Sequence, residues 1–322
     1  MPRLRSVALN INSFERFKKA EIHSAVISAI LLAPCLREFR IACPFFTHEV
    51  PLLIHRQLKI PPLTRFSYLQ ATYAAYPRAA PPQYDFLTIV LEQVPETLQE
   101  LISIIEPLPL HTIRQNIWPQ LRVLDLYGER QTVPGKPYIT LFSQMPRLKE
   151  LTLVLADPQG GDQRHAVWPL GHPAVYPWPE LESLTLTQPH PDDQLFRHLP
   201  ASMRRLTLRY FPHPYVFYLG RDGPLEFNYL DKVWNPPSPL SALEMISILR
   251  QCAPRVPDLT DLVLEFQGDR ERLDVLRCVA SSLPRLRFFQ FYWYEGEEDL
   301  RDPDVVRHIT SCSWSREIAL TM

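Results

Sequence analysis

The sequence predicts an α/β solenoid, in which a curved parallel sheet lines the concave side and helices cover the convex side. Three observations predict this fold. A leucine-based phrase recurs along the 322 residues, a proline precedes most copies, and helical periodicity fills the intervals between copies. A single strand–turn–helix unit cannot bury its apolar face alone, whereas stacked units share one core. We therefore predict that residues 1–322 form a single array of about 10–11 irregular units.

The recurring phrase has the pattern L-x-x-L-x-L, and clear copies read LRVLDL from Leu121 and LESLTL from Leu181. Successive copies start 22 to 35 residues apart, except for the 56 residues between Met203 and Leu259. In a strand, alternate residues point to opposite faces, so the leucines share one face. The copies begin at Leu4, Leu36, Leu63, Leu98, Leu121, Leu148, Leu181, Met203, Leu259, Leu286 and, in a weaker form, Ser315.

Proline is abundant, with 34 residues against 9 glycines, and its placement follows the phrase. Eight of the eleven copies have a proline two residues before the first phrase position, and the residue before that proline is apolar. Proline cannot donate to a strand ladder, and it disfavours helix at the preceding residue. We therefore expect each proline to stand at the first position of a strand. These prolines are Pro2, Pro34, Pro61, Pro119, Pro146, Pro179, Pro257 and Pro284.

Helical patterns lie between the phrases. SALEMISILRQC opens with the capping box of Ser241 and Glu244 and continues with an apolar stripe. The segment 211–239 has no repeat phase, and we predict a non-repeat excursion there, rich in tyrosine and proline. Further helices are expected in AEIHSAVISAIL (20–31), DFLTIVLEQV (85–94), ERLDVLRCVASSL (271–283) and DPDVVRHIT (302–310).

The pattern L-x-x-L-x-L is the core of leucine-rich repeats. The ordered series of phrases resembles the repeat half of basidiomycete fungal F-box/leucine-rich-repeat proteins. The resemblance rests on WPQLRVLDLYGE, MPRLKELTLVLA, PWPELESLTLTQPHPDDQLFRHLPASMRRLTLR and LSALEMISILRQCAPRVPDLTDLVLEF. In that family, an F-box helix bundle docks the Skp1 adaptor of a cullin-type ubiquitin ligase, and the repeat half holds the protein to be ubiquitinated.

The chain departs from this family because it carries no F-box. VPETLQELISII, from Val94, echoes an F-box opening but lies in repeat phase, so we predict a strand in which Ser103 breaks the leucine register. The first repeat starts at Met1, and we interpret the chain as a shortened member. The resemblance then implies a protein-interaction scaffold that recognises a ubiquitin-ligase substrate without binding Skp1. The alternative is a leucine-rich-repeat regulator or inhibitor of another protein, unrelated to ubiquitination.

Composition excludes several function classes. The formal charge of -1 and the pI near 6.8 provide no electrostatic footprint for nucleic acid or for an anionic membrane. No apolar run reaches the length of about 18 residues that a membrane-spanning helix needs. Five scattered cysteines without a CxxC pair fit reduced thiols. We therefore expect a cytoplasmic or nuclear protein that binds neither nucleic acid nor membrane.

The sequence carries no catalytic motif of the G-x-S-x-G, G-x-x-x-x-G-K-[ST], H-E-x-x-H or G-x-G-x-x-G type. We therefore predict that the chain is not an enzyme and holds no cofactor or metal. The nearest approach to a metal-ligand set is His190, His198 and His213 with Asp192 and Asp193. Their spacing matches no known site, so we interpret them as loop or surface residues.

The predicted partner surface is the concave side of the sheet, where the side chains between the leucines are exposed. Thr152, Thr185 and Thr207 occupy the same position in three successive units, and we interpret them as a β-branched ladder. The partner is an unidentified protein. The candidate partner-binding residues are Asp125, Tyr127, Glu150, Arg205, Arg209, Asp261, Glu265, Phe288 and Tyr292.

Two groups of these candidates have alternative interpretations. Arg205 and Arg209 hold the same phrase positions as Asp261 and Glu265 of the next unit. If the long interval loops out, they form two opposite-charge pairs of about 0.2–1 kcal/mol each. The alternative is that these residues are the charged half of a binding groove. The aromatic residues at 288–294 are either an exposed hot spot or a core beneath a C-terminal helix.

Overall fold

The computed structural model describes residues 3–10, 24–42, 59–69, 81–131, 133, 136–156, 164–210, 238–268, 270–294 and 320–321. Most of the phrase copies form short strands. The strands are β1 (Ser6–Asn10), β2 (Glu38–Ala42), β3 (Arg65–Tyr68), β4 (Glu100–Ile104), β5 (Val123–Glu129), β6 (Glu150–Ala156), β7 (Ser183–Thr187), β8 (Arg205–Arg209), β9 (Asp261–Gln267), β10 (Phe288–Tyr294) and β11 (Leu320–Thr321).

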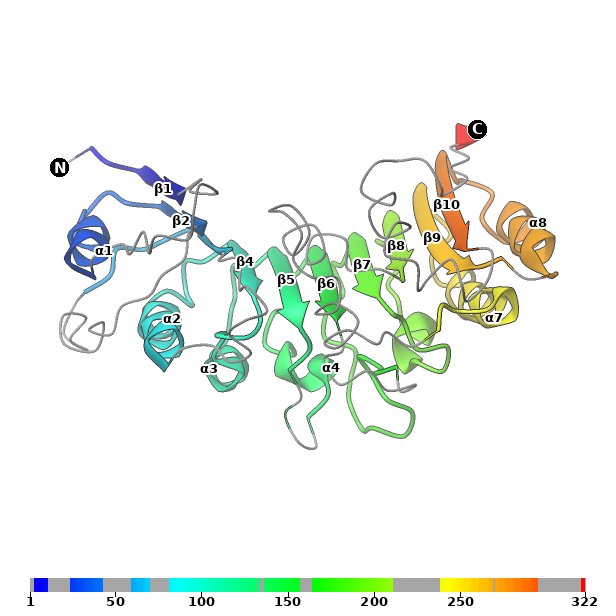
Figure 1. Ribbon diagram of the computed structural model, residues 1–322, viewed down its shortest axis with the longest axis horizontal. Helices are drawn as coiled ribbons and strands as arrows, with labels where there is room; N and C mark the ends of the chain where they lie inside the picture. The colour runs from blue at the N-terminus through cyan, green and yellow to red at the C-terminus, as the bar shows by residue number, and fades with distance from the viewer. Residues whose placement is uncertain are drawn as a thin grey trace, which may run out of the picture.

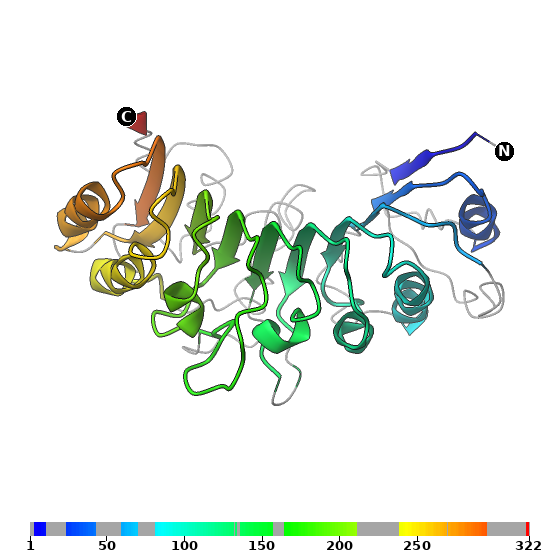
Figure 2. The ribbon, with the colours of Figure 1, turned by 180° about the vertical axis from the view of Figure 1, so that it is seen from behind.

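All of the described strands belong to one sheet, in which they lie side by side in sequence order. The ten strands from β1 to β10 are parallel, and the sheet does not close into a barrel. Figures 1 and 2 show the sheet as an arc, with the strands along its inner side and the helices along its outer side. The predicted α/β class and parallel sheet are therefore confirmed.

One column of leucines crosses the sheet because neighbouring strands keep the same register. Leu124 pairs with Leu151, Leu151 with Leu184, Leu184 with Leu206, and Leu206 with Leu262. Each of these side chains is at most 1% exposed. The predicted alignment of the phrases is therefore confirmed. It continues across the 56-residue interval, because β8 and β9 are direct neighbours.

The helices return the chain along the outer side of the arc (Figure 2). The predicted capping box is confirmed: the Ser241 hydroxyl accepts from Glu244 N, and the Glu244 carboxylate accepts from Ser241 N. The helices are α1 (Ser24–Leu31), α2 (Pro81–Gln93), α3 (Leu110–Gln115), α4 (Tyr138–Leu141), α7 (Ala242–Cys252), α8 (Arg272–Ser282) and the 3-10 helix η2 (Gln194–Arg197). The helix expected at 302–310 and nearly all of the predicted excursion at 211–239 lie outside the described residues.

The outer layer is thinnest between β5 and β8, where the described helical segments are α4 and η2, of four residues each. Buried aromatic side chains cover the leucine column there. The Trp178 indole Nε1 donates to the Phe142 carbonyl at 3.0 Å, and Trp168 Nε1 donates to the His172 carbonyl at 3.1 Å. Because these polar N–H groups find acceptors, the large rings can be buried without leaving a donor unsatisfied.

Six of the eight prolines of the repeated phrase lie in turns, which corrects the expectation that they open strands. Leu121 N donates to the Trp118 carbonyl at 3.3 Å, and Leu181 N donates to the Trp178 carbonyl at 3.1 Å. Pro119 and Pro179 are thus each the second residue of a β-turn, a position for which the fixed φ of proline is suited, and the same type of hydrogen bond closes turns around Pro34, Pro146, Pro257 and Pro284. β5 begins only four residues after Pro119. In these six turns the apolar residue before the proline is buried, whereas the proline is partly or fully exposed.

Two further expectations about strands are wrong. Ser103 does not break the register, since it pairs with Leu126 and is buried, and its hydroxyl donates to the Ile104 carbonyl at 2.8 Å. The local hydrogen bond lets serine occupy a leucine position. The weak copy from Ser315 is not an eleventh parallel strand, because its described part, β11, pairs antiparallel with β10. Antiparallel pairing means that the chain enters β11 from the opposite end of the neighbouring strand.

Candidate functional site

The predicted partner-binding side chains lie on the inner face of the arc, opposite the leucine column. The alternation of strand side chains places them there, as expected. Eight of the nine are partly or fully exposed, and Arg205 is the most open of the charged ones. Glu265 is the exception, because it is only 2% exposed. Glu265 is therefore not an accessible contact residue, which corrects the prediction for that position.

Three carboxylates gather on the central strands β4 to β6. Val123 on β5 pairs in register with Glu100 on β4 and with Glu150 on β6. Asp125 lies two residues after Val123 on β5. Burial raises the pKa of Asp125, a hydrogen bond with Thr152 lowers it, and the charges of Glu150 and Glu100 raise it further. We call these three residues the central acidic group; Asp125 and Glu150 were predicted partner-binding residues, whereas Glu100 was not.

Arginines already neutralise the two outer members of the central acidic group. Arg65 lies 3.3 Å from the Glu100 carboxylate, and Arg205 lies 3.1 Å from the Glu150 carboxylate. Among the described residues, no ion pair involves Asp125. Asp125 is therefore the carboxylate of this group that remains open to a cation from outside.

The Arg205 ion pair differs from the predicted one. Arg205 is in register with Asp261, as expected if β8 and β9 are neighbours. Its guanidinium nevertheless contacts Glu150, two strands away, across the short side chain of Ser183. Asp261 instead accepts a hydrogen bond from the Thr260 hydroxyl at 2.5 Å. The strand register was predictable, but the ion-pair partner of Arg205 depends on the small size of Ser183 on the intervening strand.

The second predicted pair is present as a long contact. Arg209 Nε lies 4.0 Å from Glu265 Oε1. The other carboxylate oxygen of Glu265 accepts from Tyr210 N at 3.0 Å. Both contacts hold the buried Glu265 inside the structure, so this pair has a structural role at the edge of the inner face.

The polar and aromatic columns of the inner face follow the same register. Thr152, Thr185 and Thr207 pair in succession, so the predicted threonine ladder is confirmed. Phe288 and Tyr292 are partly exposed and lie beside Asp261 and Glu265 on the next strand. The remaining aromatic residues of β10 belong to the opposite face: Phe289, Phe291 and Trp293 stack there with centroid distances of 5.2 Å. The predicted aromatic cluster is thus divided between the two faces of the sheet.

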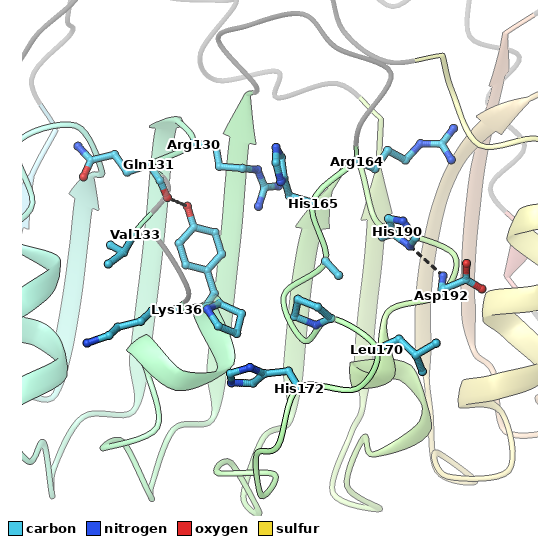
Figure 3. A pocket seen from close by; sticks show the side chains of 14 residues that line it. Arg130, Gln131, Val133, Lys136, Arg164, His165, Leu170, His172, His190 and Asp192 are labelled. Atoms are coloured by element: carbon cyan, nitrogen blue, oxygen red, sulfur yellow. Dashed lines mark hydrogen bonds between the residues drawn. The ribbon is translucent and has the colours of Figure 1, made fainter.

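A pocket of about 600 Å³, which no sequence pattern predicted, lies beyond the carboxyl ends of β5, β6 and β7 (Figure 3). The segments that follow these strands form its walls. Cationic and imidazole side chains dominate the polar part of the lining: Arg130, Lys136, Arg164, His165, His172 and His190. We call this cavity the Arg130 pocket. Its residues come from three connections that share no phase with the leucine phrase, so periodicity gave no signal for it.

The histidine and aspartate residues considered as metal ligands serve local structure instead. His190 Nδ1 accepts from Asp192 N at 3.0 Å, and the His198 ring packs 4.6 Å from the Trp168 ring. Asp193 is buried and accepts three backbone N–H groups at 2.6–3.0 Å, while burial raises its pKa to about 6. No group of three metal-ligating residues occurs in the described part of the chain. His213 lies outside that part.

Comparison with known proteins does not identify the chain. No family model matches it, and no curated protein is significantly similar to it. None of the helices in the described segments is long and apolar enough to cross a membrane.

Proposed function

We propose that this chain is a leucine-rich-repeat solenoid that binds a protein partner on its concave face. The observation that carries the proposal is the central acidic group, in which Asp125 has no ion pair among the described residues while Glu100 and Glu150 each have one. Partly exposed side chains in register on adjacent strands form a continuous surface of the kind that curved repeat proteins use for binding.

The partner would present a basic side chain to Asp125. Burial and the neighbouring carboxylates raise the pKa of Asp125, so an approaching cation would relieve an unfavourable negative charge. Phe288 and Tyr292, at the far end of the sheet, offer aromatic area for a second contact with the same partner. The proposed partner therefore combines a basic segment with an apolar one.

The resemblance to fungal F-box/leucine-rich-repeat proteins supports a further proposal about the role of binding. The bound protein would be a ubiquitination substrate, and this chain would act as the recognition half without itself contacting Skp1. The alternative is that the chain inhibits or regulates the bound protein directly. The two differ in what happens to the partner when the chain is depleted: its ubiquitination falls in the first case, and its own activity changes in the second.

The test compares affinity purification with the wild-type chain, with Asp125→Arg and with a control on the outer side. Arg277→Glu is the control because Arg277 lies on α8, is largely exposed and pairs only with the nearby Asp274 among the described residues. We expect the same partner to be recovered with the wild-type chain and the control but lost with Asp125→Arg. Partners that all survive Asp125→Arg, in a variant with unchanged melting temperature, would refute concave-face binding.

A milder substitution measures the charge contribution alone. Asp125→Asn keeps the size of the side chain and the hydrogen bond with Thr152 but removes the charge. Titration calorimetry with the purified partner should give a dissociation constant raised about tenfold, corresponding to about 1.4 kcal/mol. An unchanged constant would mean that the partner contacts the inner face elsewhere.

A further inference from the structure

We propose that the amino-terminal edge of the sheet binds an extended acidic segment of another protein. The surface consists of the ten residues that stand directly before the ten parallel strands, one for each strand, and we call it the basic rim. It lies at the opposite edge from the Arg130 pocket and apart from the inner face, so it goes beyond the proposed function and does not depend on it. Six of the ten rim residues are cationic: Arg5, Arg37, Arg122, Lys149, Arg204 and Arg287.

Main-chain hydrogen bonds hold the basic rim in one row. The N–H of each rim residue donates to the carbonyl of the rim residue on the preceding strand at 2.8–2.9 Å, in all nine steps from Arg5 to Arg287. Each of these carbonyls also accepts the next N–H of the same neighbouring strand, so the main chain is saturated and a partner is recognised through side chains. Nine steps of about 4.8 Å make a row of about 43 Å, which an extended chain of about 13 residues would span.

Acidic side chains neutralise only part of the basic rim. Glu182 is its single acidic member, and it pairs with Lys149 at 2.5 Å. Arg204 pairs with Asp258, from the turn before β9, at 3.2 Å. The whole chain has a formal charge of -1, so six cationic residues against one acidic residue in a single row are a local segregation of charge. Such a segregation favours an anionic partner.

The remaining four cationic residues of the basic rim are available to a partner. Within the described segments, none of them forms an ion pair. Arg5, Arg122 and Arg287 are exposed, whereas Arg37 is partly exposed and donates to the Leu36 carbonyl at 2.8 Å. A guanidinium without an anionic partner can donate two parallel hydrogen bonds to a carboxylate. Because each exposed ion pair contributes little on its own, the partner must supply several carboxylates together.

A hollow of about 670 Å³ lies at the rim where β8, β9 and β10 begin. Three cations and one anion line it, because Arg204, Arg285 and Arg287 stand there with Asp258. The Asp258 carboxylate pairs with both Arg204 and Arg285, so Arg287 is the cation of this hollow that has no ion pair among the described residues. A carboxylate side chain that enters the hollow would therefore contact Arg287 and reduce the net positive charge.

The partner class that fits the basic rim is an acidic polypeptide and not a nucleic acid. No rim residue is aromatic, so the row offers no platform on which bases could stack. A nucleic-acid strand carries a phosphate at every residue, and its phosphates would also meet Glu182 and Asp258 between the free cations. A polypeptide can place uncharged residues at these points and carboxylates at the others.

The test measures fluorescence anisotropy with the full chain and three labelled probes of equal length, about 13 residues. The first is a peptide that alternates glutamate and serine, the second carries glutamine in place of glutamate, and the third is single-stranded DNA. At about 50 mM salt, the glutamate peptide should bind with a dissociation constant of about 1 mM or lower, about tenfold tighter than the other probes.

Each other outcome of this comparison contradicts part of the proposal. Equal binding of the glutamine peptide would overturn recognition by charge. Equal or tighter binding of the DNA would overturn the assignment of a protein partner. No detectable binding of the glutamate peptide at about 1 mM would overturn the whole proposal.

Charge-reversal variants then locate the site. Arg122→Glu and Arg287→Glu should each raise the dissociation constant of the glutamate peptide about threefold, and the double variant about tenfold. Arg270→Glu is the matched control, because Arg270 is exposed, forms no ion pair in the described part of the chain and follows β9 at the other edge of the sheet. It should leave binding unchanged. An equal loss of affinity in the control would show that only net charge matters and would overturn the rim.

Two further measurements keep the result unambiguous. Melting temperatures equal to wild type establish that the variants are folded, and Arg122→Glu and Arg287→Glu each test the rim if the other does not fold. Asp125→Arg, which changes the inner face, should not weaken the glutamate peptide. A loss of affinity in that variant would place the peptide on the inner face and refute binding at the rim.

Discussion

The central and C-terminal parts of the sheet share one register but have different outer layers. In the C-terminal part, α7 and α8, each of eleven residues, cover β9 and β10. In the central part, from β5 to β8, the described helical segments are α4 and η2, with four residues each. The leucine column nevertheless continues from one part into the other without a shift.

The difference teaches that the strand phrase, and not the returning helix, determines the architecture. A strand needs an apolar cover on one face, and either a helix stripe or buried aromatic rings supply it. Where the rings replace the helix, their indole N–H groups must find acceptors, and irregular connections provide those carbonyls. The same irregular connections leave room for the Arg130 pocket. The irregular connections of the central part therefore both cover its leucine column and form the Arg130 pocket.

The largest expected effect is a loss of stability when the leucine column is interrupted in either part of the sheet. Leu184→Asp in the central part and Leu262→Asp in the C-terminal part each bury an unpaired carboxylate at a fully buried position. Each should destabilise the fold by several kcal/mol, measured as loss of the circular dichroism transition in urea. Leu243→Asp is the control, because Leu243 is 61% exposed on α7. A wild-type urea midpoint for Leu184→Asp would contradict a continuous core.

The next effect compares the residues that precede the turn prolines. Trp178→Ala in the central part should cost about 3–5 kcal/mol, because the indole fills the outer layer and donates to Phe142. Val256→Ala, the equivalent position before β9, should cost about 2 kcal/mol, since α7 provides cover there. The measurement is the free energy of unfolding in urea. Equal costs at the two positions would show that the aromatic ring carries no special role.

A pH effect is expected from Glu106, which follows β4 at the start of the central part. Its carboxylate accepts from Glu129 N at 2.7 Å, but burial raises its pKa from 4.5 to about 7. The folded chain therefore keeps a proton that the unfolded chain releases, so this contribution to stability is lost as pH rises from 4.5 through 7. The total loss is about 3 kcal/mol, of which about 1 kcal/mol falls between pH 6 and 8.

Urea unfolding at pH 6 and pH 8 measures this effect, with Glu106→Gln as the comparison. The amide removes the titrating group, so the variant should lose the decrease of about 1 kcal/mol between these two values. Asp193 contributes with the same sign at lower pH, since burial raises its pKa from 3.8 to about 6. Because Asp193 titrates in both proteins, the difference in slope between wild type and Glu106→Gln isolates Glu106. The same slope in wild type and variant would contradict the assignment.

The smallest expected effect belongs to the helix-covered part. Ser241→Ala removes the side-chain acceptor at the start of α7 and should lower the free energy of unfolding by about 1 kcal/mol. Ser281→Ala, at an exposed position on α8, should change it by less than about 0.5 kcal/mol. Chemical denaturation of the two variants side by side distinguishes the cap from a general effect of losing a hydroxyl.

The sequence predicted the sheet well because the leucine positions alone determine it. The strand order, the alignment of Leu124 with Leu151 and the adjacency of β8 and β9 all follow from one phrase. Interval length did not matter, since an insertion between phrases leaves the ladder unchanged. The Ser241 capping box was equally predictable, because its two residues lie within one helix turn.

The sequence predicted contacts poorly where they depend on more than one unit. The Arg205 guanidinium reaches Glu150 because Ser183 is small, and a pairwise comparison of neighbouring phrases does not include that residue. The turn position of Pro119 was missed because only the main-chain hydrogen bond distinguishes a turn from a strand start. The Arg130 pocket needs three connections at once, none of which has a periodic pattern.

The sequential strand order has a mechanical consequence. If the chain is pulled at its ends along the arc, the ladders between neighbouring strands are loaded in series, because in the described sheet the strands are hydrogen-bonded in sequence order. Extension would then release the strands one at a time at low force. Each step would free the residues of one interval: the 27 from Leu121 to Leu148 correspond to about 90 Å of extended chain. Under tension the molecule would behave as an extensible tether that lengthens in stages.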